Sequence, residues 1–468
     1  MGREKDMMTN WQGERVVILG AARQGQALAR FLARHGAQVT LNDRRKPEEM
    51  SSAMNSLADL ELTWELGGHP LSLLDQADLL AVSGGVPLDN PLVVEAKRRR
   101  IPLTNDSQVF MEAAPCKTIG ITGSAGKTTT TILVGRIAQA DTAGRLRRAW
   151  VGGNIGDPLI NHVDEMTPDD IAILELSSFQ LEQMTISPHV AAILNITPNH
   201  LDRHGTMEAY TAAKTRILAF QSPEALAVLG RDDPGSWGLA DQVRGRLLSF
   251  GFTALPAGAE GALLRDGGFF LSTDGIETDL PVRDVIGLRG EHNRLNVLAA
   301  CTISFAAGFA PLAMRAGVSG FQGAPHRLEF VREWRGAAWY NDSIATAPER
   351  TMAAIRSFDE PLVLMLGGRD KNLPWSELAD LARRRVDHLV VFGEASDKIS
   401  AAIGPRVPGQ RPFSLVRCRS LRDAVRAASR AAQPGYVVLF APGGTSFDEF
   451  KDFEERGECF RKWVQELS

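Results

Sequence analysis

Three segments of the chain share one local pattern, in which an apolar run leads into a glycine-rich turn and then into helical spacing. The first segment, RVVILGAARQGQALARFLARHGAQVTLND, occupies residues 15–43. The second, CKTIGITGSAGKTTTTILVGRIA, starts at Cys116, and the third runs from about Pro325 through PLVLMLGG, HLVVFG and YVVLFAPGG. Strands that alternate with helices predict an α/β fold with largely parallel sheets, whose ligands gather at the carboxyl ends of the strands.

The glycine-rich turn of the second segment, GITGSAGKTTT, has the residues of a phosphate-binding loop. Backbone amides of Gly123 to Lys127 could surround a phosphate, Lys127 could neutralise it, and Thr128 could offer a hydroxyl to Mg²⁺ at a helix N-terminus. The general P-loop pattern is only partly met, because Ile121 stands where its first glycine belongs. This loop predicts a nucleoside triphosphate as ligand.

Polar side chains follow two further apolar runs of the same segment. Glu175 ends the run IAIL, and NITPNHLDRHG places Asn195, Thr197, His200 and Asp202 after another. Each of these residues alone is more often a cap or a surface group. The polar ends of these runs, converging on the phosphate loop, together favour a magnesium site, because Mg²⁺ prefers hard oxygen ligands.

The length agrees with three domains, because 468 residues at roughly 150 per domain give about three. We expect a Rossmann-like N-terminal domain over residues 1–114, a central ATPase domain of the P-loop type over 115–323 and a Rossmann-like C-terminal domain over 324–468. A predominantly β insertion is expected around residues 255–282.

Charge and cysteine usage exclude several classes of partner. The formal net charge is −4 and the pI about 6.2, so no overall basic field favours a nucleic acid. The four cysteines lie far apart without a Cys-x-x-Cys pair, which is typical of a reducing cytoplasm. The start of the sequence lacks an apolar signal segment, so we expect a cytoplasmic protein with no membrane partner.

The first glycine turn offers a rival interpretation. A glycine turn followed some twenty residues later by Asp43 imitates a dinucleotide-binding fingerprint, but GAARQG contains only Gly20 and Gly25 and lacks the middle glycine. An NAD-dependent dehydrogenase is therefore disfavoured.

Motifs along nearly the whole chain resemble the Mur ligase family, the ATP-dependent amino-acid ligases of peptidoglycan precursor synthesis. The matching stretches, in chain order, are GSAGKTTT, GGNIG, ELSSFQLE, NITPNHLDRHG, YTAAK, GEHNRLN, PHRLE and YNDS. Within the family, ELSSFQLE, PHRLE and FDEFKDFEERG look most like the members that add the second amino acid.

The resemblance implies an ADP-forming ligase that joins D-glutamate to UDP-N-acetylmuramoyl-L-alanine. In this family the γ-phosphoryl group of ATP passes to the L-alanine carboxylate, and the glutamate amine then attacks the acyl phosphate. Both steps build negative charge on oxygen, which preorganised cations and amides stabilise. The N-terminal domain would bind the UDP-sugar, the central domain ATP and the C-terminal domain glutamate, and we expect a monomer.

The resemblance also implies roles for residues around ATP and its metals. The catalytic residues would be Lys127, Asn154, His200, Lys214 and Arg327. ATP would contact Gly123, Ser124, Ala125, Gly126, Lys127, Thr128, Thr129, Asn293, Asn296, Arg327 and Asp342. Two Mg²⁺ ions would be held by Thr128, Glu175, His200 and Lys214.

The other two substrates have their own expected residues. The UDP-sugar would contact Arg23, Gln24, Asp43, Arg44, Arg45, Gly85 and Asn154, and glutamate would contact Thr346, Lys371, Ser446 and Phe453. Lysine with hydroxyl groups suits a dicarboxylate, although Lys371 by itself resembles an ordinary loop lysine.

Lys214, in YTAAK, matches the family lysine that carries a carbamate. Adding CO₂ to a neutral amine converts a potential cation into an anion that can serve a metal site. From spacing alone, Lys214 would be an ordinary exposed helix lysine.

Two departures from the family pattern affect the glutamate site. Ile344 stands in YNDSIAT where many relatives have lysine, and APGGTS replaces the more usual turn before Ser446. Ligation of L-glutamate therefore stays open, as do a folylpolyglutamate synthase-like ligase and an inactive nucleotide-binding regulatory protein.

Overall fold

The computed structural model describes residues 11–142, 147–286 and 290–468. The chain forms two compact units. One comprises the described residues up to Ile286 together with Glu291–Phe321, and the other comprises Gln322–Ser468 with Gly290. Within the described ranges, no helix is both long and apolar enough to cross a membrane.

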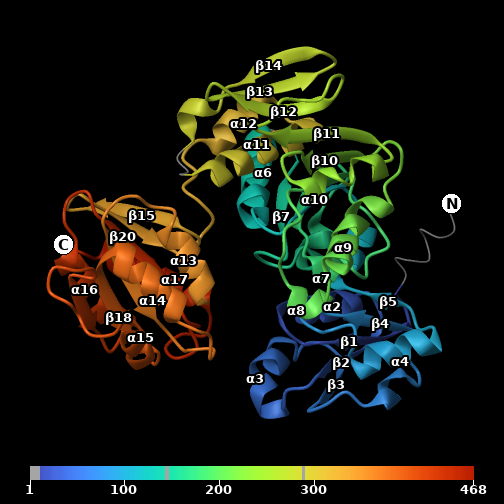
Figure 1. Cartoon of the computed structure of the whole chain (residues 1–468). Coiled ribbons are helices and arrows are strands. Elements are labelled where there is room, and N and C mark those ends of the chain that lie inside the picture. The colour runs from blue at the N-terminus through green and yellow to red at the C-terminus, as the bar shows by residue number, and fades with distance from the viewer. Residues whose placement is uncertain (1–10, 143–146, 287–289) are drawn as a thin grey trace. The chain divides into compact units, whose positions relative to one another are not determined.

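The first unit begins with a fully parallel sheet of five strands in the order β3-β2-β1-β4-β5 (Figure 1). The strands are β1 (Arg15–Leu19), β2 (Gln38–Asp43), β3 (Leu62–Leu66), β4 (Leu79–Val82) and β5 (Leu103–Thr104). The helical segments between and after them are α2 (Arg23–Arg34), α3 (Pro47–Ser56), η1 (Leu71–Leu74), α4 (Pro91–Arg99) and α5 (Asp106–Ala113).

The second sheet of this unit has nine strands in the order β14-β13-β12-β11-β10-β9-β6-β8-β7. Its strands are β6 (Lys117–Thr122), β7 (Ala149–Gly153), β8 (Ile171–Glu175), β9 (Val190–Ile193), β10 (Leu226–Gly230), β11 (Arg246–Gly251), β12 (Glu260–Arg265), β13 (Gly268–Thr273) and β14 (Ile276–Leu280). Its helical segments are α6 (Lys127–Thr142), η2 (Leu159–Glu165), α7 (Ser178–Leu181), α8 (Leu201–His204), α9 (Met207–Ala219), α10 (Pro234–Trp237), η3 (Ala240–Gln242), η4 (Arg283–Val285), α11 (Glu291–Ala306) and α12 (Pro311–Val318).

The region expected as a β insertion is part of this second sheet. β12 pairs in parallel with β11, and β13 and β14 then continue the sheet as antiparallel neighbours. The predicted β structure around residues 255–282 is therefore confirmed, and it extends the central sheet at one edge.

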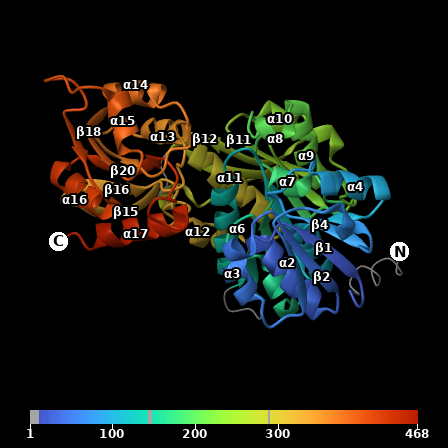
Figure 2. The ribbon, with the colours of Figure 1, turned by 90° about the horizontal axis from the view of Figure 1, so that it is seen from below.

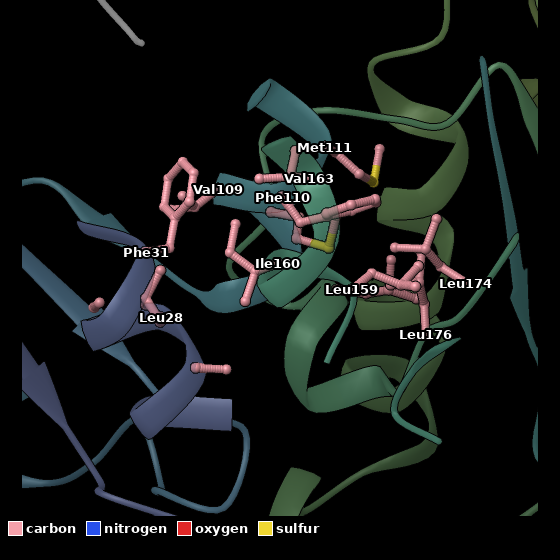
Figure 3. Close-up of a cluster of buried hydrophobic side chains, with 14 of the residues drawn as sticks. Leu28, Phe31, Val109, Phe110, Met111, Leu159, Ile160, Val163, Leu174 and Leu176 are labelled. Atoms are coloured by element: carbon pink, nitrogen blue, oxygen red, sulfur yellow. The ribbon is translucent and has the colours of Figure 1, made fainter. Parts of the chain in front are cut away.

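The two sheets of the first unit share one hydrophobic cluster (Figure 3). Leu28 and Phe31 of α2 lie in this cluster together with Phe110 of α5, Ile160 of η2 and Leu174 of β8. Burying such side chains contributes about 1.5–3 kcal/mol each relative to leaving them exposed. Apolar packing therefore joins α2 and α5 to η2 and β8.

The second unit contains a six-stranded sheet in the order β15-β16-β20-β17-β18-β19, parallel except between β15 and β16. The strands are β15 (Glu329–Trp334), β16 (Ala337–Asn341), β17 (Leu362–Gly367), β18 (Val386–Phe392), β19 (Ser414–Arg417) and β20 (Val437–Gly443). The helices are α13 (Pro348–Ile355), α14 (Ser376–Arg385), α15 (Ser396–Ile403), α16 (Leu421–Ala431) and α17 (Phe453–Gln465).

Helices cover both faces of this sheet (Figures 1 and 2). α13, α14 and α15 contribute to one buried cluster, and α16 and α17 contribute to another on the opposite face. The buried residues of α16 recur at helical spacing, which gives this helix one apolar face towards the sheet. They are Leu421, Ala424, Val425 and Ala428. The α/β class predicted from the alternating pattern is confirmed.

A close contact between α6 and α12 provides a test of this packing. A Cβ atom added to Gly317 would lie 2.6 Å from the backbone Cα of Ile137, and backbone cannot move aside as a flexible side chain can. We expect Gly317→Ala to lower the free energy of unfolding by about 1–3 kcal/mol, measured by urea denaturation. Leu312→Ala, at an exposed position of the same helix, is the control and should change it by less than about 0.5 kcal/mol. Equal stabilities of the two variants would contradict this account of the contact.

Candidate active site

The phosphate loop lies between the end of β6 and the start of α6. Strand β6 ends at Thr122, helix α6 starts at Lys127, and Gly126 between them has a φ of +83°. A Cβ atom on Gly126 would lie only 2.3 Å from the side-chain oxygen of Asn296. Glycine is therefore required here for both backbone conformation and space.

Two lysine side chains meet at one backbone carbonyl of this loop. The Nζ atom of Lys127 donates a hydrogen bond to the Gly123 carbonyl at 2.8 Å, and the Nζ atom of Lys214 donates to the same oxygen at 2.9 Å. Lys214 comes from α9 and also donates to the hydroxyl of Thr122 at 3.3 Å. Two amines that converge on one acceptor favour the neutral form of one of them.

Lys214 is the amine that becomes neutral. Only 1% of this residue is exposed, and burial is the main cause that lowers the pKa of its side chain to about 6, with the charge of Lys127 adding to the effect and that of Glu175 opposing it. Its Nζ atom also lies 4.8 Å from the ring centre of Tyr210. Lys214 is thus a buried, largely neutral amine at neutral pH, in contrast to the exposed helix lysine that spacing alone predicts.

The neighbouring strands place a carboxylate and an amide beside the loop. Glu175, which is 2% exposed at the end of β8, accepts a hydrogen bond from the Thr128 hydroxyl at 2.8 Å. Its other carboxylate oxygen accepts one from the Asn154 amide at 3.0 Å. Carboxylate, hydroxyl and amide oxygens are the donor types that suit Mg²⁺, so the residues present fit this metal.

The loop is tied to the end of β9 by a second set of hydrogen bonds. The Asn195 side-chain oxygen accepts from the backbone amide of Ala125 at 2.8 Å, and the Ser124 hydroxyl donates to the Thr197 carbonyl at 2.8 Å. The Tyr210 hydroxyl lies 3.0 Å from the same Ser124 hydroxyl. Tyr210 was not expected at the site, although its four-residue separation from Lys214 on one helix is a signal that could have indicated it.

His200 lies at the N-cap of α8 with a φ of +53°, a rare conformation for a non-glycine residue. Desolvation, and next the charge of Lys127, lower the pKa of its ring, so the neutral form that can bind a metal is favoured. Its ring lies edge-on to that of Phe179, with centres 5.1 Å apart. The neutral ring is compatible with the metal role expected for His200.

Asn293 and Asn296, which were expected to contact ATP, lie on the first turns of α11. The Asn296 amide donates to the Asn293 side-chain oxygen at 3.3 Å, and Asn296 also packs against Gly126 of the loop. Thr129, which was also expected to contact the nucleotide, is buried within α6.

The residues expected at the UDP-sugar gather around the first glycine turn. The Gln24 amide donates to the Gly153 carbonyl at 2.7 Å, which brings α2 to the residue preceding Asn154. Asp43 accepts from the Ala21 backbone amide at 2.9 Å and from the Arg45 side chain at 2.8 Å. Burial alone would raise the pKa of Asp43, but these hydrogen bonds outweigh it and hold the pKa well below its usual range. Arg23, Arg44 and Gly85 are exposed on the same unit.

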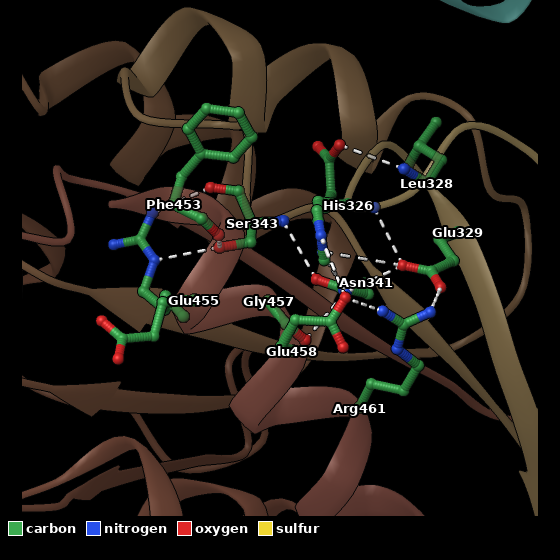
Figure 4. A network of polar contacts seen from close by, with 12 residues as sticks. His326, Leu328, Glu329, Asn341, Ser343, Phe453, Glu455, Gly457, Glu458 and Arg461 are labelled. Atoms are coloured by element: carbon green, nitrogen blue, oxygen red, sulfur yellow. Dashed lines mark hydrogen bonds and ion pairs between the residues drawn. The ribbon is translucent and has the colours of Figure 1, made fainter. Parts of the chain in front are cut away.

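A buried polar network lies in the second unit (Figure 4). Glu329 accepts from the backbone amide of His326 at 2.8 Å, from the Asn341 side chain at 3.0 Å and from Arg461 at 2.9 Å. The His326 ring lies 3.1 Å from the same Asn341 amide. This network fixes the start of the second unit, where Arg327 and Asp342 were expected to serve the nucleotide.

Asp342 is almost completely buried next to this network. Burial raises the pKa of its carboxyl to about 7, although the hydrogen bond from the Leu328 amide at 3.1 Å and the charge of Arg327 oppose the rise. Arg327 itself is half-buried.

The residues expected around glutamate lie near the carboxyl ends of the strands of this unit. Arg369 and Thr445 pair through their backbones beyond β17 and β20, which places the loops of Lys371 and Ser446 side by side. The Phe453 carbonyl accepts from the Ser343 hydroxyl at 2.8 Å, and Thr346 follows in the loop after Ser343. Lys371 is exposed, whereas Ser446 is 1% exposed.

An unexpected arginine underlies this arrangement. Arg456 is completely buried, and its guanidinium donates to the Ser343 carbonyl at 2.8 Å and to the Gly444 carbonyl at 3.1 Å. Burial lowers its pKa to about 10, so it remains charged at neutral pH. It joins the turns that precede Thr346 and Ser446.

Models of protein families match three parts of the chain. The MurD-like N-terminal domain of Mur ligases matches residues 14–105, the Mur ligase middle domain matches 121–304, and the glutamate ligase domain of Mur ligases matches 326–444.

Individual relatives extend the similarity over nearly the full length. The UDP-N-acetylmuramoylalanine–D-glutamate ligase of Symbiobacterium thermophilum is 39% identical over 97% of this chain and 98% of its own. The corresponding ligase of Koribacter versatilis is 38% identical over 98% of both chains.

Solved structures at lower identity support the fold. MurF from Acinetobacter baumannii has a TM-score of 0.57 at 19% identity, over 98% of both chains. The UDP-N-acetylmuramate–alanine ligase MurC from Thermotoga maritima has a TM-score of 0.56 at 18% identity, over 97% of this chain and 99% of the other.

The lowered pKa of Lys214 makes stability depend on pH. Because the folded pKa of about 6 lies below the ordinary lysine value of 10.5, the protein loses stability relative to Lys214→Met as pH falls from 10.5 towards 6. We expect the unfolding free energy of the wild type minus that of Lys214→Met to decrease from pH 9 to pH 6.5, by at most about 1.4 kcal/mol per pH unit.

Urea unfolding in CO₂-depleted buffer without nucleotide measures this difference. Lys117→Met, at an exposed position where β6 starts, is measured in parallel as the control for the loss of a lysine. A flat profile for Lys214→Met would show that Lys214 is not desolvated in solution.

Proposed function

The chain belongs to the Mur ligase family, and we propose that it catalyses the ATP-dependent ligation of D-glutamate to UDP-N-acetylmuramoyl-L-alanine in peptidoglycan precursor synthesis. The observation that carries this proposal is the group formed by the phosphate loop, Glu175 and Lys214 at one edge of the central sheet. Relatives named for this activity match 97–98% of the chain, which supports the same assignment.

In this proposal the first step is phosphoryl transfer from ATP to the L-alanine carboxylate, which gives an acyl phosphate and ADP. The amine of glutamate then attacks the acyl carbon, and inorganic phosphate leaves. Lys127 and the loop amides would stabilise charge on the phosphoryl oxygens, and the Asn154 amide would orient the carboxylate or the transferred group. Asn293, Asn296, Arg327 and Asp342 would bind the remainder of the nucleotide.

Magnesium would be held by Thr128, Glu175, His200 and a carbamate on Lys214, and when bound it supplies charge compensation for the phosphates. The low pKa of Lys214 supports the carbamate, because CO₂ adds only to a neutral amine. The anion formed would remove the repulsion between the charges of two lysines that share the Gly123 carbonyl.

We assign residues 1–114 to the UDP-sugar, 115–323 to ATP and 324–468 to glutamate. Thr346, Lys371, Ser446 and Phe453 would surround the glutamate carboxylates, and Arg23, Gln24, Asp43, Arg44, Arg45 and Gly85 would surround the UDP-sugar. The lysine that many relatives have at position 344 is replaced by a half-buried isoleucine. Lys371 is then the cation expected to orient the dicarboxylate.

The direct test is a paired assay with UDP-N-acetylmuramoyl-L-alanine, ATP and Mg²⁺ against D- and L-glutamate. The wrong stereoisomer would leave at least one carboxylate mispaired, which costs about 2–5 kcal/mol, so we expect a preference for D-glutamate of roughly 30-fold or more in kcat/KM. Phosphate release that requires both UDP-N-acetylmuramoyl-L-alanine and glutamate is the readout.

Lys127→Ala serves as the matched inactive variant of this assay. It should fold like the wild type, because the side chain lies in a loop contact and not in the core, and it should have no measurable turnover. Preference for L-glutamate would overturn the stereochemical assignment and leave the ligase mechanism intact. Turnover on a folate in place of the UDP-sugar, or none with any acceptor, would instead favour the folylpolyglutamate-type or the regulatory alternative.

The carbamate is tested separately. Lys214→Ala should be inactive, and short carboxylates such as acetate or formate should partly restore turnover by taking the place of the carbamate. Lys117→Ala, at the exposed start of β6, should need no rescue. Full activity of Lys214→Ala without added carboxylate would refute the role of this residue.

A further inference from the structure

The loop that follows β4 runs beside the first glycine turn. The backbone amide of Ser83 donates to the Leu19 carbonyl at 3.0 Å, and its hydroxyl donates to the Gly20 carbonyl at 2.9 Å. On the other side, a Cβ atom on Gly84 would contact Gln180 and Phe179 of α7 at 3.7 and 3.9 Å. The segment from Ser83 to Val86, here called the SGGV loop, therefore lies between the first sheet and α7.

Arg203 of α8 is bound to this loop and to α7 at once. Its guanidinium donates to the carbonyls of Gly84 at 3.5 Å, Gly85 at 3.3 Å and Val86 at 3.0 Å. The same group lies 4.2 Å from the ring centre of Phe179, a cation–π contact. One side chain thus joins three consecutive carbonyls of the loop to the aromatic residue of α7.

The same aromatic ring contacts two further residues of the α8 segment. Phe179 stacks on His204 with ring centres 5.1 Å apart and an interplanar angle of 4°, and it meets His200 edge-on at 5.1 Å. α8 has only four residues, too few to be stable by its own hydrogen bonds. Its position, and with it that of His200, depends on these side-chain contacts.

We propose that Arg203 is a positioning residue that couples the SGGV loop to His200. Binding of the UDP-sugar at this loop then sets the position of His200. This inference rests on the proposed function, which assigns Gly85 to the UDP-sugar and His200 to the metal site. An arginine is needed because several N–H donors in one plane must reach carbonyls of consecutive residues, which the single ammonium of lysine cannot do.

The test compares Arg203→Ala and Arg203→Lys with the wild type. Calorimetric titration with UDP-N-acetylmuramoyl-L-alanine in the absence of ATP should give a Kd raised by about 10- to 100-fold in Arg203→Ala, the effect expected for hydrogen bonds of a charged donor. The Kd of ADP should change by less than about 3-fold, and kcat should fall as well because His200 loses its support. Arg203→Lys should restore less than half of the lost binding free energy.

The matched control is Arg136→Ala. Arg136 also donates to two carbonyls, of Gly317 and Ser319 at 2.8 Å each, and lies 5.6 Å from the ring centre of Phe321. It makes the same kinds of contact in the same unit, at the end of α12 and in the residues that follow it. It should lower thermal stability and leave the Kd of UDP-N-acetylmuramoyl-L-alanine unchanged.

Hydrogen exchange supplies a readout that does not depend on turnover. The amides of residues 84–86 should exchange faster in Arg203→Ala than in the wild type, and not in Arg136→Ala. An unchanged Kd for the UDP-sugar in Arg203→Ala, or equal weakening of UDP-sugar and ADP, would overturn the positioning role while the proposed function stands. A wild type that fails to bind UDP-N-acetylmuramoyl-L-alanine would instead overturn the proposed function. If Arg203→Ala does not fold, the same outcomes are decided with Arg203→Lys.

Discussion

The hydrogen bonds from two lysines to the single carbonyl of Gly123 are the interaction on which the candidate site depends. Lys127 reaches this oxygen from the start of α6 and Lys214 from α9, so the carbonyl connects the phosphate loop to a residue 91 positions further along the chain. Two ammonium ions so close would repel each other, and burial leaves Lys214 as the neutral partner. These two hydrogen bonds hold the loop, and the amine of Lys214 is kept in the neutral form that can react.

The alternating pattern of the sequence predicts the sheets well, because parallel strands buried on both faces require long apolar runs. Once β6 lies between β8 and β9, with β7 beside β8, every residue that follows these strands must meet at one edge. The proximity of Asn154 and Glu175 to the phosphate loop follows from strand order alone. Glu175 could be placed near the loop from the apolar run that it ends, whereas Asn154 was expected there only from the family resemblance.

Contacts made by side chains of helices could not be predicted in this way. The burial of Lys214, the aromatic contacts of Phe179 and the three carbonyl bonds of Arg203 depend on how α7, α8 and α9 pack, and no strand order determines that. Arg456 is a similar case, since a charged residue on α17 gives no sequence signal that it is completely buried. Such residues link motifs that are distant in sequence, so their environment exists only in the folded chain.

Burial also changes the charge of the site from what a count of basic residues suggests. Lys127, His200 and Lys214 are three basic side chains of the candidate site, but desolvation lowers the pKa of both His200 and Lys214. The protein therefore presents less positive charge than three basic side chains could carry. A triphosphate that arrives with Mg²⁺ brings its own charge compensation, and a site filled with fixed cations would compete with the metal for the same oxygens. In the proposed function, the neutral amine of Lys214 is the form that CO₂ can convert into an anionic ligand, and the neutral ring of His200 is the form that can bind a metal.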